Sequence, residues 1–268
     1  MAILTVLFAW VGSVLGGKQG AIIAFVVAAL MNFGGYWFSD KLVLRRYQAQ
    51  EVGPEDGSGL YRIVSELTKN AQLPMPKVFV IPVQTPNAFV TGRNPQHAAV
   101  AAIQGLLQLL DEDEVAGVMA HELTHVKNKD TLTSTIAAAF AGAIAVLSQI
   151  ARYQPRNSRQ RQNPLAMIFI LIGAPPAAVL IRMLISRIRE YAADEGGAEV
   201  SRKPLSLASA LIKIHQGIKR NPLVGGNPAH SPLFIVNPFF GGFQRLFSTH
   251  PPVEERIRRL HAIAQQMG

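Results

Sequence analysis

The chain has 268 residues, a net charge of +9 and no cysteine, which excludes disulfide frameworks, thiol catalysis and thiolate metal sites. Charged residues make up only 16% of it, against about 25% in ordinary soluble domains. The deficit is concentrated in four uncharged stretches, residues 2–17, 19–39, 131–151 and 162–181, with basic residues beside them. That placement suits anionic lipid head groups better than nucleic acid. We therefore expect a lipid bilayer as a partner, and no nucleic acid.

Residues 1–39 are predicted to form an N-terminal transmembrane helical hairpin. Residues 19–39 are long enough to cross about 30 Å of hydrocarbon as a helix. Residues 2–17 are shorter, and a secretory signal peptide is the alternative. They have neither a basic start nor a small-residue cleavage site, and a second apolar segment follows at once, so the hairpin is favoured.

Residues 40–130 have the composition of a soluble domain. Apolar residues at helical spacing predict a helix over residues 60–71. Three β-rich runs predict a three-stranded antiparallel sheet. The runs are residues 77–81, 87–91 and 98–102; a loop is expected at 53–57 and a turn at 92–95.

Residues 131–182 are predicted to form a second apolar helical hairpin, followed by an amphipathic region at 183–268. If all four stretches cross, the two soluble regions lie on one side of the membrane. The loop at 152–161, with four arginines, would then lie outside, against the positive-inside rule. Whether 131–151 and 162–181 cross fully therefore stays open.

A helix from Asp111 to about Val126 is expected, because acids in a first turn complement the helix dipole. It carries His121 and His125, whose four-residue spacing puts both imidazoles on one face, where they can share a zinc ion. Glu122 is offset by one residue and can reach a water at the metal.

A catalytic zinc ion usually has three protein ligands and one open position. Glu190 is the favoured third ligand, and Asp194, one helical turn away, can accept a hydrogen bond from a ligand histidine. The alternative is a surface acid pair beside Arg187 and Arg189. The other candidate ligands are Glu195, His215, His230 and His250.

The sequences at 121–130 (HELTHVKNKD) and 186–194 resemble HtpX-type membrane zinc metalloproteases, relatives of the prenyl-protein (CAAX) endopeptidases. The likeness includes residues 86–92 and 248–257 and covers nearly the whole chain. It implies that His121, His125 and Glu190 bind one zinc ion per chain and that Glu122 is catalytic. It also implies a zincin-like fold, mainly α with a small antiparallel β-sheet and about four transmembrane or membrane-associated helices.

Two further roles follow from the same resemblance. Asn87, Ala88, Phe89 and Val90 match an edge strand to which an extended substrate adds by main-chain hydrogen bonds; an ordinary half-buried strand is the alternative. His250 is expected to donate a hydrogen bond to the developing oxyanion, with Arg256 orienting the region. The alternative there is a simple helix start.

The expected function is a zinc-dependent endopeptidase whose catalytic domain has two parts, 40–130 and 183–268. The resemblance implies cleavage of membrane or misfolded proteins, as protein quality control, on the cytoplasmic face of a bacterial inner membrane. An intramembrane protease is disfavoured, because charged residues flank the motif at 111–114 and 127–130. A non-catalytic membrane protein with a structural metal site is the other alternative; it needs a fourth ligand, such as His250 or His230.

Overall fold

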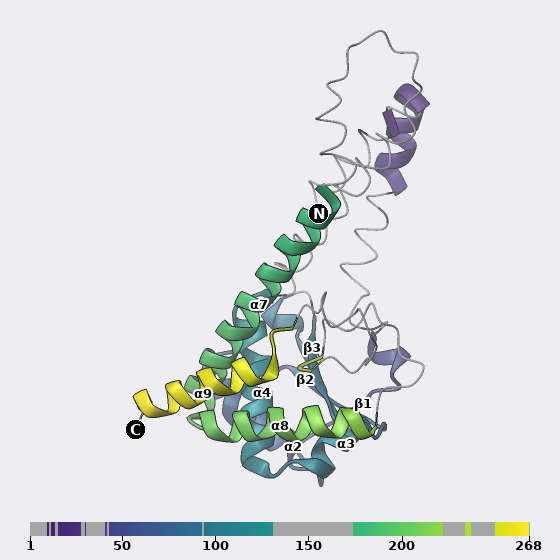
Figure 1. Ribbon diagram of the computed structural model, residues 1–268. Coiled ribbons are helices and arrows are strands. Elements are labelled where there is room, and N and C mark those ends of the chain that lie inside the picture. Colours follow the sequence, from purple (N-terminus) through teal and green to yellow (C-terminus); the bar gives the residue numbers. More distant parts are fainter. Residues whose placement is uncertain are drawn as a thin grey trace. The chain divides into compact units, whose positions relative to one another are not determined.

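The computed structural model describes residues 10, 12–13, 16–27, 30, 41, 43–92, 94–130, 174–221, 234–236 and 250–267 (Figure 1). The chain divides into two compact units. One comprises Met1–Trp37 and Thr133–Ile185, and the other Phe38–Leu132 and Ser186–Gly268. The two predicted apolar hairpins fall largely outside the described residues. Among helices within the described ranges, none combines the length and the hydropathy needed to cross a membrane.

The second unit contains a four-stranded mixed sheet of order β1-β2-β4-β3. β2 pairs with β4 in parallel, whereas β1–β2 and β3–β4 are antiparallel. The prediction of a purely antiparallel, three-stranded sheet was therefore wrong, and the three-residue β1 was missed. The strands are β1 (Gln50–Val52), β2 (Lys77–Ile81), β3 (Ala88–Thr91) and β4 (Ala99–Ile103).

The prediction of the sheet failed because β4 is a central strand. All five of its residues are buried and apolar, as expected for a strand covered on both faces. Because β4 inserts between β2 and β3, the strand that follows β2 in sequence becomes the edge of the sheet. Gly92 makes the β3–β4 turn possible: its φ is +125°, and a Cβ there would lie 2.3 Å from the carbonyl oxygen of His97.

Two apolar clusters cover the two faces of the sheet. Val100 and Ala102 of β4 face the larger cluster, which the helices build. Ala101 and Ile103 face a smaller one that includes Phe89 and residues of the segment before β1. The helices are α2 (Leu60–Ala71), α3 (Gln104–Leu109), α4 (Glu112–Lys127), α7 (Ala174–Ser201), α8 (Pro204–Arg220) and α9 (Val253–Met267), with a 3-10 turn at Pro95–His97.

The helix α4 is the centre of the helical layer, packed against α2 and α8. The predicted helix at 60–71 is confirmed, and so is the acidic start of α4. Asp111 accepts from the Glu114 backbone N–H at 2.9 Å, and the Glu114 carboxylate accepts from the Asp111 backbone N–H at 3.0 Å. This reciprocal capping box fixes where α4 begins.

Two glycines allow α7 to approach α4 at the turn that carries the histidines. A Cβ on Gly197 would lie 2.9 Å from the backbone nitrogen of His121. A Cβ on Gly196 would lie 2.6 Å from the Thr124 methyl group. Since Glu190 and Asp194 precede these glycines on α7, the close approach sets both carboxylates against α4.

Candidate active site

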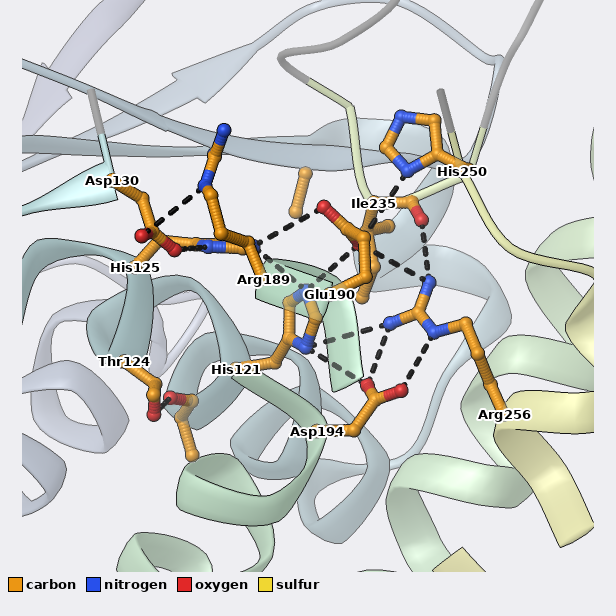
Figure 2. A network of polar contacts seen from close by, with 12 residues as sticks. His121, Thr124, His125, Asp130, Arg189, Glu190, Asp194, Ile235, His250 and Arg256 are labelled. Atoms are coloured by element: carbon orange, nitrogen blue, oxygen red, sulfur yellow. Dashed lines mark hydrogen bonds and ion pairs between the residues drawn. The ribbon is translucent and has the colours of Figure 1, made fainter. Parts of the chain in front are cut away.

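The structure brings His121, His125 and Glu190 together, as Figure 2 shows. The two Nε2 atoms lie 3.1 Å apart. Glu190 Oε2 is 3.7 Å from His121 Nε2, and Glu190 Oε1 is 3.7 Å from His125 Nε2. Residues of α4 and α7, separated by more than 60 positions, thus present three ligand atoms to one point.

These residues fit a divalent cation. The distance between the two Nε2 atoms is close to the about 3.3 Å expected for two nitrogens about 2.05 Å from a tetrahedral zinc ion. Glu190 Oε2 is buried and makes no hydrogen bond within the described part of the chain, although His250 Nδ1 lies 3.4 Å and Arg256 Nη1 3.6 Å from it. A buried carboxylate oxygen is costly without such a partner or a metal ion. Two imidazoles and a carboxylate are a donor set that zinc accepts.

The other ring nitrogen of each histidine faces a carboxylate, to which an N–H at that nitrogen can donate. His121 Nδ1 is 3.0 Å from Asp194 Oδ1, and His125 Nδ1 is 2.6 Å from Asp130 Oδ2. A proton held at Nδ1 leaves the Nε2 lone pair free for a metal ion. Asp194 was among the predicted residues, whereas Asp130 was not. Asp130 ends the HELTHVKNKD run, but nothing in that run shows that the chain turns back and sets its carboxylate against His125.

Arg256, from α9, is the largest fully buried side chain among the described residues. It donates to both oxygens of Asp194, and its Nη1 donates to the Ile235 carbonyl at 2.9 Å. Burial raises the pKa of Asp194, but Arg256 and His121 outweigh this and hold it below its usual value. Burial also lowers the pKa of His121, although Asp194 opposes the effect. Both pKa shifts favour the protonation states that metal binding requires, an ionised Asp194 carboxylate and a neutral His121 imidazole.

Glu122 lies on α4 and is only 2% exposed. Burial raises its pKa to about 7, while His125, Arg256 and a hydrogen bond from the Val90 backbone N–H act in the opposite direction. A carboxyl group with a pKa near neutrality can both accept and release a proton under ordinary conditions. Glu122 therefore has the electrostatics expected of a general acid/base.

The predicted substrate strand lies at the edge of the sheet, as β3, but its first part is covered. The Ile235 backbone N–H donates to the Ala88 carbonyl at 3.2 Å, and the Asn87 side-chain amide donates to the Val236 carbonyl at 2.7 Å. Phe89 is buried, with its ring 5.6 Å from that of Phe234. Asn87, Ala88 and Phe89 thus contact residues 234–236 or the core, and Val90 reaches Glu122.

Of the remaining candidate metal ligands, one lies beside the cluster and the others do not belong to it or lie outside the described residues. His250 Nδ1 is 3.4 Å from Glu190 Oε2, so its ring lies beside the cluster. Glu195 is exposed on α7. His215 lies on α8 and does not belong to the one metal-ligating cluster found among the described residues. His230 lies outside the described residues.

Comparison with known proteins identifies the family of the chain. The family model described as peptidase family M48 matches residues 54–264. A protease HtpX homolog from Pyrococcus furiosus is 52% identical over 274 residues, covering 100% of this chain and 95% of that protein. One from Syntrophobacter fumaroxidans is 48% identical, covering 98% of this chain and 96% of that protein.

The fold has a relative among solved structures. The crystal structure of S. mikatae Ste24p aligns with a TM-score of 0.59 and 21% identity, over 97% of this chain. This chain spans 62% of the length of that protein, and the likeness concerns the fold alone. The resemblance to HtpX-type proteases is confirmed by the full-length relatives, and the chain belongs to peptidase family M48 and is a metalloendopeptidase.

Proposed function

We propose that this metalloendopeptidase uses one zinc ion to hydrolyse peptide bonds of membrane or misfolded proteins at the cytoplasmic surface of a membrane. The observation that carries the proposal is the convergence of His121, His125 and Glu190 on one point, with Glu122 buried beside them. In this assignment the three residues hold the ion. Glu122 acts as the acid/base.

When bound, zinc supplies Lewis-acid chemistry, because it polarises a carbonyl and makes water more acidic. Glu122 then accepts the proton that the attacking water loses and delivers it to the leaving amine. Its pKa of about 7 suits both halves of that task. Asp194 and Asp130 keep the two imidazoles in the tautomer with a free Nε2.

Two neighbouring groups are proposed to contact the substrate. The alternation of β3 directs the main chain of Val90 to the free side of the strand, next to Glu122. An extended substrate can add to β3 there, once its own main chain replaces the contact between Val90 and Glu122. His250, beside Glu190, is placed to donate to the developing oxyanion.

The membrane setting is proposed from the sequence. Four uncharged stretches precede or interrupt the catalytic unit, and the basic residues beside them favour a cytoplasmic catalytic unit. A site tethered in this way meets membrane proteins at high local concentration, which supports such proteins as substrates. Inverted membrane vesicles test the orientation: an added soluble substrate is cleaved at once if the site faces the cytoplasm, and only after detergent if it does not.

A single substitution tests the assignment of Glu122. Detergent-solubilised Glu122→Gln is expected to retain about one zinc ion per chain and to lose casein-type proteolysis, since the ligands stay while the base is removed. Metal analysis and proteolysis are measured beside the wild type and beside Glu66→Gln, an exposed acid on α2. Full activity in Glu122→Gln removes this residue from the mechanism, and a wild type without bound zinc refutes the cofactor.

A further inference from the structure

Asp130 lies between one candidate metal ligand and one arginine. Its Oδ2 is 2.6 Å from His125 Nδ1, and its Oδ1 is 3.1 Å from Arg189 Nε, so its two oxygens serve two partners (Figure 2). The carboxylate is 6% exposed, and the arginine side chain 18%. Solvent screening is weak at such burial, so the pair can hold the carboxylate in place.

The backbone reaches this contact through an unfavourable conformation. α4 ends at Lys127, and Lys129 then adopts a left-handed φ of +55°. For a residue other than glycine this conformation costs about 1–2 kcal/mol. The turn brings Asp130 back toward His125, five positions earlier. Gln72 after α2 and Arg202 after α7 adopt the same left-handed backbone, so this is a helix-ending turn, and here it places Asp130 against His125 and Arg189.

The positions of the two residues along the chain add a second observation. The compact unit that contains the site is built from Phe38–Leu132 and Ser186–Gly268. Asp130 lies two residues before the chain leaves this unit, and Arg189 lies three residues after it returns. Arg189 also directly precedes Glu190. The ion pair therefore joins the end of α4 to α7 at the two junctions, each beside a candidate ligand.

The two histidines are not held equally. Asp194, the partner of His121, receives two hydrogen bonds from Arg256, at 2.8 and 2.7 Å. Within the described ranges, the recorded contact of Asp130, the partner of His125, with an arginine is one ion pair to Arg189 at 3.1 Å. His125 is accordingly the ligand whose orientation depends more on one ion pair.

We propose that Asp130 and Arg189 form a clasp that positions His125, so that zinc affinity depends on how the chain is fastened where it leaves and re-enters the catalytic unit. The inference rests on the proposed zinc site. Neither residue touches the reacting atoms; both are positioning residues. Their effect passes through the imidazole of His125 and through the register of α7, which carries Glu190.

The test measures zinc affinity in the full-length protein in detergent, by competition with a chromophoric chelator. Arg189→Gln and Asp130→Asn are each expected to weaken zinc binding about 10–100-fold, the usual effect of removing a partner of a metal ligand. Because the two residues act as one unit, the double variant should bind zinc about as weakly as either single variant. Arg189→Lys should recover part of the affinity.

A matched control is the exposed ion pair between Asp113 and Lys203, which joins α4 to the residue before α8. Asp113→Asn should bind zinc within about twofold of the wild type. Lys129→Gly, which accepts a left-handed backbone, should also keep its affinity, whereas the β-branched Lys129→Val should lose it. If Asp130→Asn fails to fold, Arg189→Gln and the two Lys129 variants still test the clasp.

Melting curves separate positioning from general destabilisation. The zinc-free variants should melt below the zinc-free wild type, because a largely buried ion pair is broken, so the deciding quantity is the rise produced by zinc, which should shrink as affinity falls. Zinc affinity unchanged in Arg189→Gln, or reduced equally in Asp113→Asn, overturns the clasp. Either result leaves the zinc-peptidase assignment standing. A wild type that binds no zinc instead removes the proposed function and the clasp with it.

Discussion

Arg256 donates to both carboxylate oxygens of Asp194, with Nε 2.8 Å from Oδ2 and Nη2 2.7 Å from Oδ1. The same Oδ1 lies 3.0 Å from His121 Nδ1. Arg256 on α9 thus orients His121, a proposed zinc ligand, through an aspartate on α7. The planar guanidinium fork matches a carboxylate in a way that an ammonium group does not.

Arg256→Lys is expected to destabilise the protein strongly. Lysine keeps the positive charge but cannot hold both oxygens of Asp194, and a hydrogen bond to a charged group contributes about 1.5–3 kcal/mol. Zinc affinity should fall as well, because His121 loses its fixed partner. Thermal unfolding in detergent and chelator competition measure the two effects. Arg258→Lys, at a side chain 78% exposed, is the control and should stay within about 0.5 kcal/mol of the wild type.

Gly197→Ala is expected to separate α7 from α4. The new methyl group would lie 2.9 Å from the backbone nitrogen and 3.0 Å from the Cα of His121, and backbone atoms cannot move aside as a flexible side chain can. Such overpacking costs about 1–3 kcal/mol. It should also weaken zinc binding, since Glu190 and Asp194 move with α7.

The control for Gly197→Ala is Gly57→Ala, because a Cβ at Gly57 meets nothing within 4 Å. Zinc affinity and melting temperature are measured for both variants. Wild-type zinc affinity in Gly197→Ala would show that α7 can shift without carrying the ligands away.

The parts of the fold that follow local periodicity could be predicted from the sequence. The helix at 60–71 has its apolar residues at helical spacing, and the acids at 111–114 mark the start of α4. The pairing of β2 with β4 could not be read in this way, because it depends on which strand inserts between two others. The continuous apolar run of β4 was the available signal, since it is typical of a central strand.

The residues of the candidate site also fall into two groups, those that local spacing predicts and those that depend on contacts between distant parts of the chain. His121 and His125 were predicted from their spacing on one helix. For Glu190 and Asp194 the spacing left a surface acid pair open, and the resemblance to HtpX-type proteases favoured the metal site. Asp130 depends on a left-handed turn at a lysine, a residue type that gives no sign of such a backbone. Arg256 depends on α9 meeting α7, and residues 234–236 reach Asn87 across 149 positions. Residue type and local spacing say nothing of such distant pairings.

Glu114→Gln is expected to lower the melting temperature of the zinc-free protein by about 2–4 °C at pH 7, the effect of about 1 kcal/mol. Glutamine can keep the capping box through its amide oxygen, but it removes the charge beside Lys213 and replaces the oxygen that accepts from Ser209 by an amide NH2, which cannot accept. Burial raises the pKa of Glu114, but these contacts outweigh it and place the pKa below the usual 4.5.

Because the pKa of Glu114 is lowered in the folded protein, the stabilisation that its charge provides depends on pH. A carboxyl group with a depressed pKa in the folded state stabilises the protein above its unfolded pKa, and this stabilisation is lost as pH falls through the folded pKa. The difference between wild type and Glu114→Gln should therefore be full at pH 7 and shrink below pH 4.5. Melting curves in the presence of chelator measure it, with Glu66→Gln, an exposed acid, as the control. A difference that grows in acid contradicts the assignment.

His250→Ala distinguishes a catalytic site from a closed structural one. The His250 ring lies 3.4 Å from Glu190 Oε2, near enough to donate to a developing oxyanion or to approach the ion itself. As an oxyanion donor, His250 contributes in the transition state alone. Its loss should lower kcat about 10²–10³-fold, with zinc affinity and KM little changed. As a fourth ligand, its loss should release zinc instead, because a structural zinc site needs all four donors.

Chelator competition and steady-state proteolysis on the same His250→Ala preparation separate the two outcomes. His261→Ala, at an exposed histidine on α9, is the control for removing an imidazole. We expect the loss to appear in kcat. The proposed site offers three metal ligands and the buried carboxyl group of Glu122 beside them, which suits a site with one position left for water, whereas a closed site has no use for a group like Glu122.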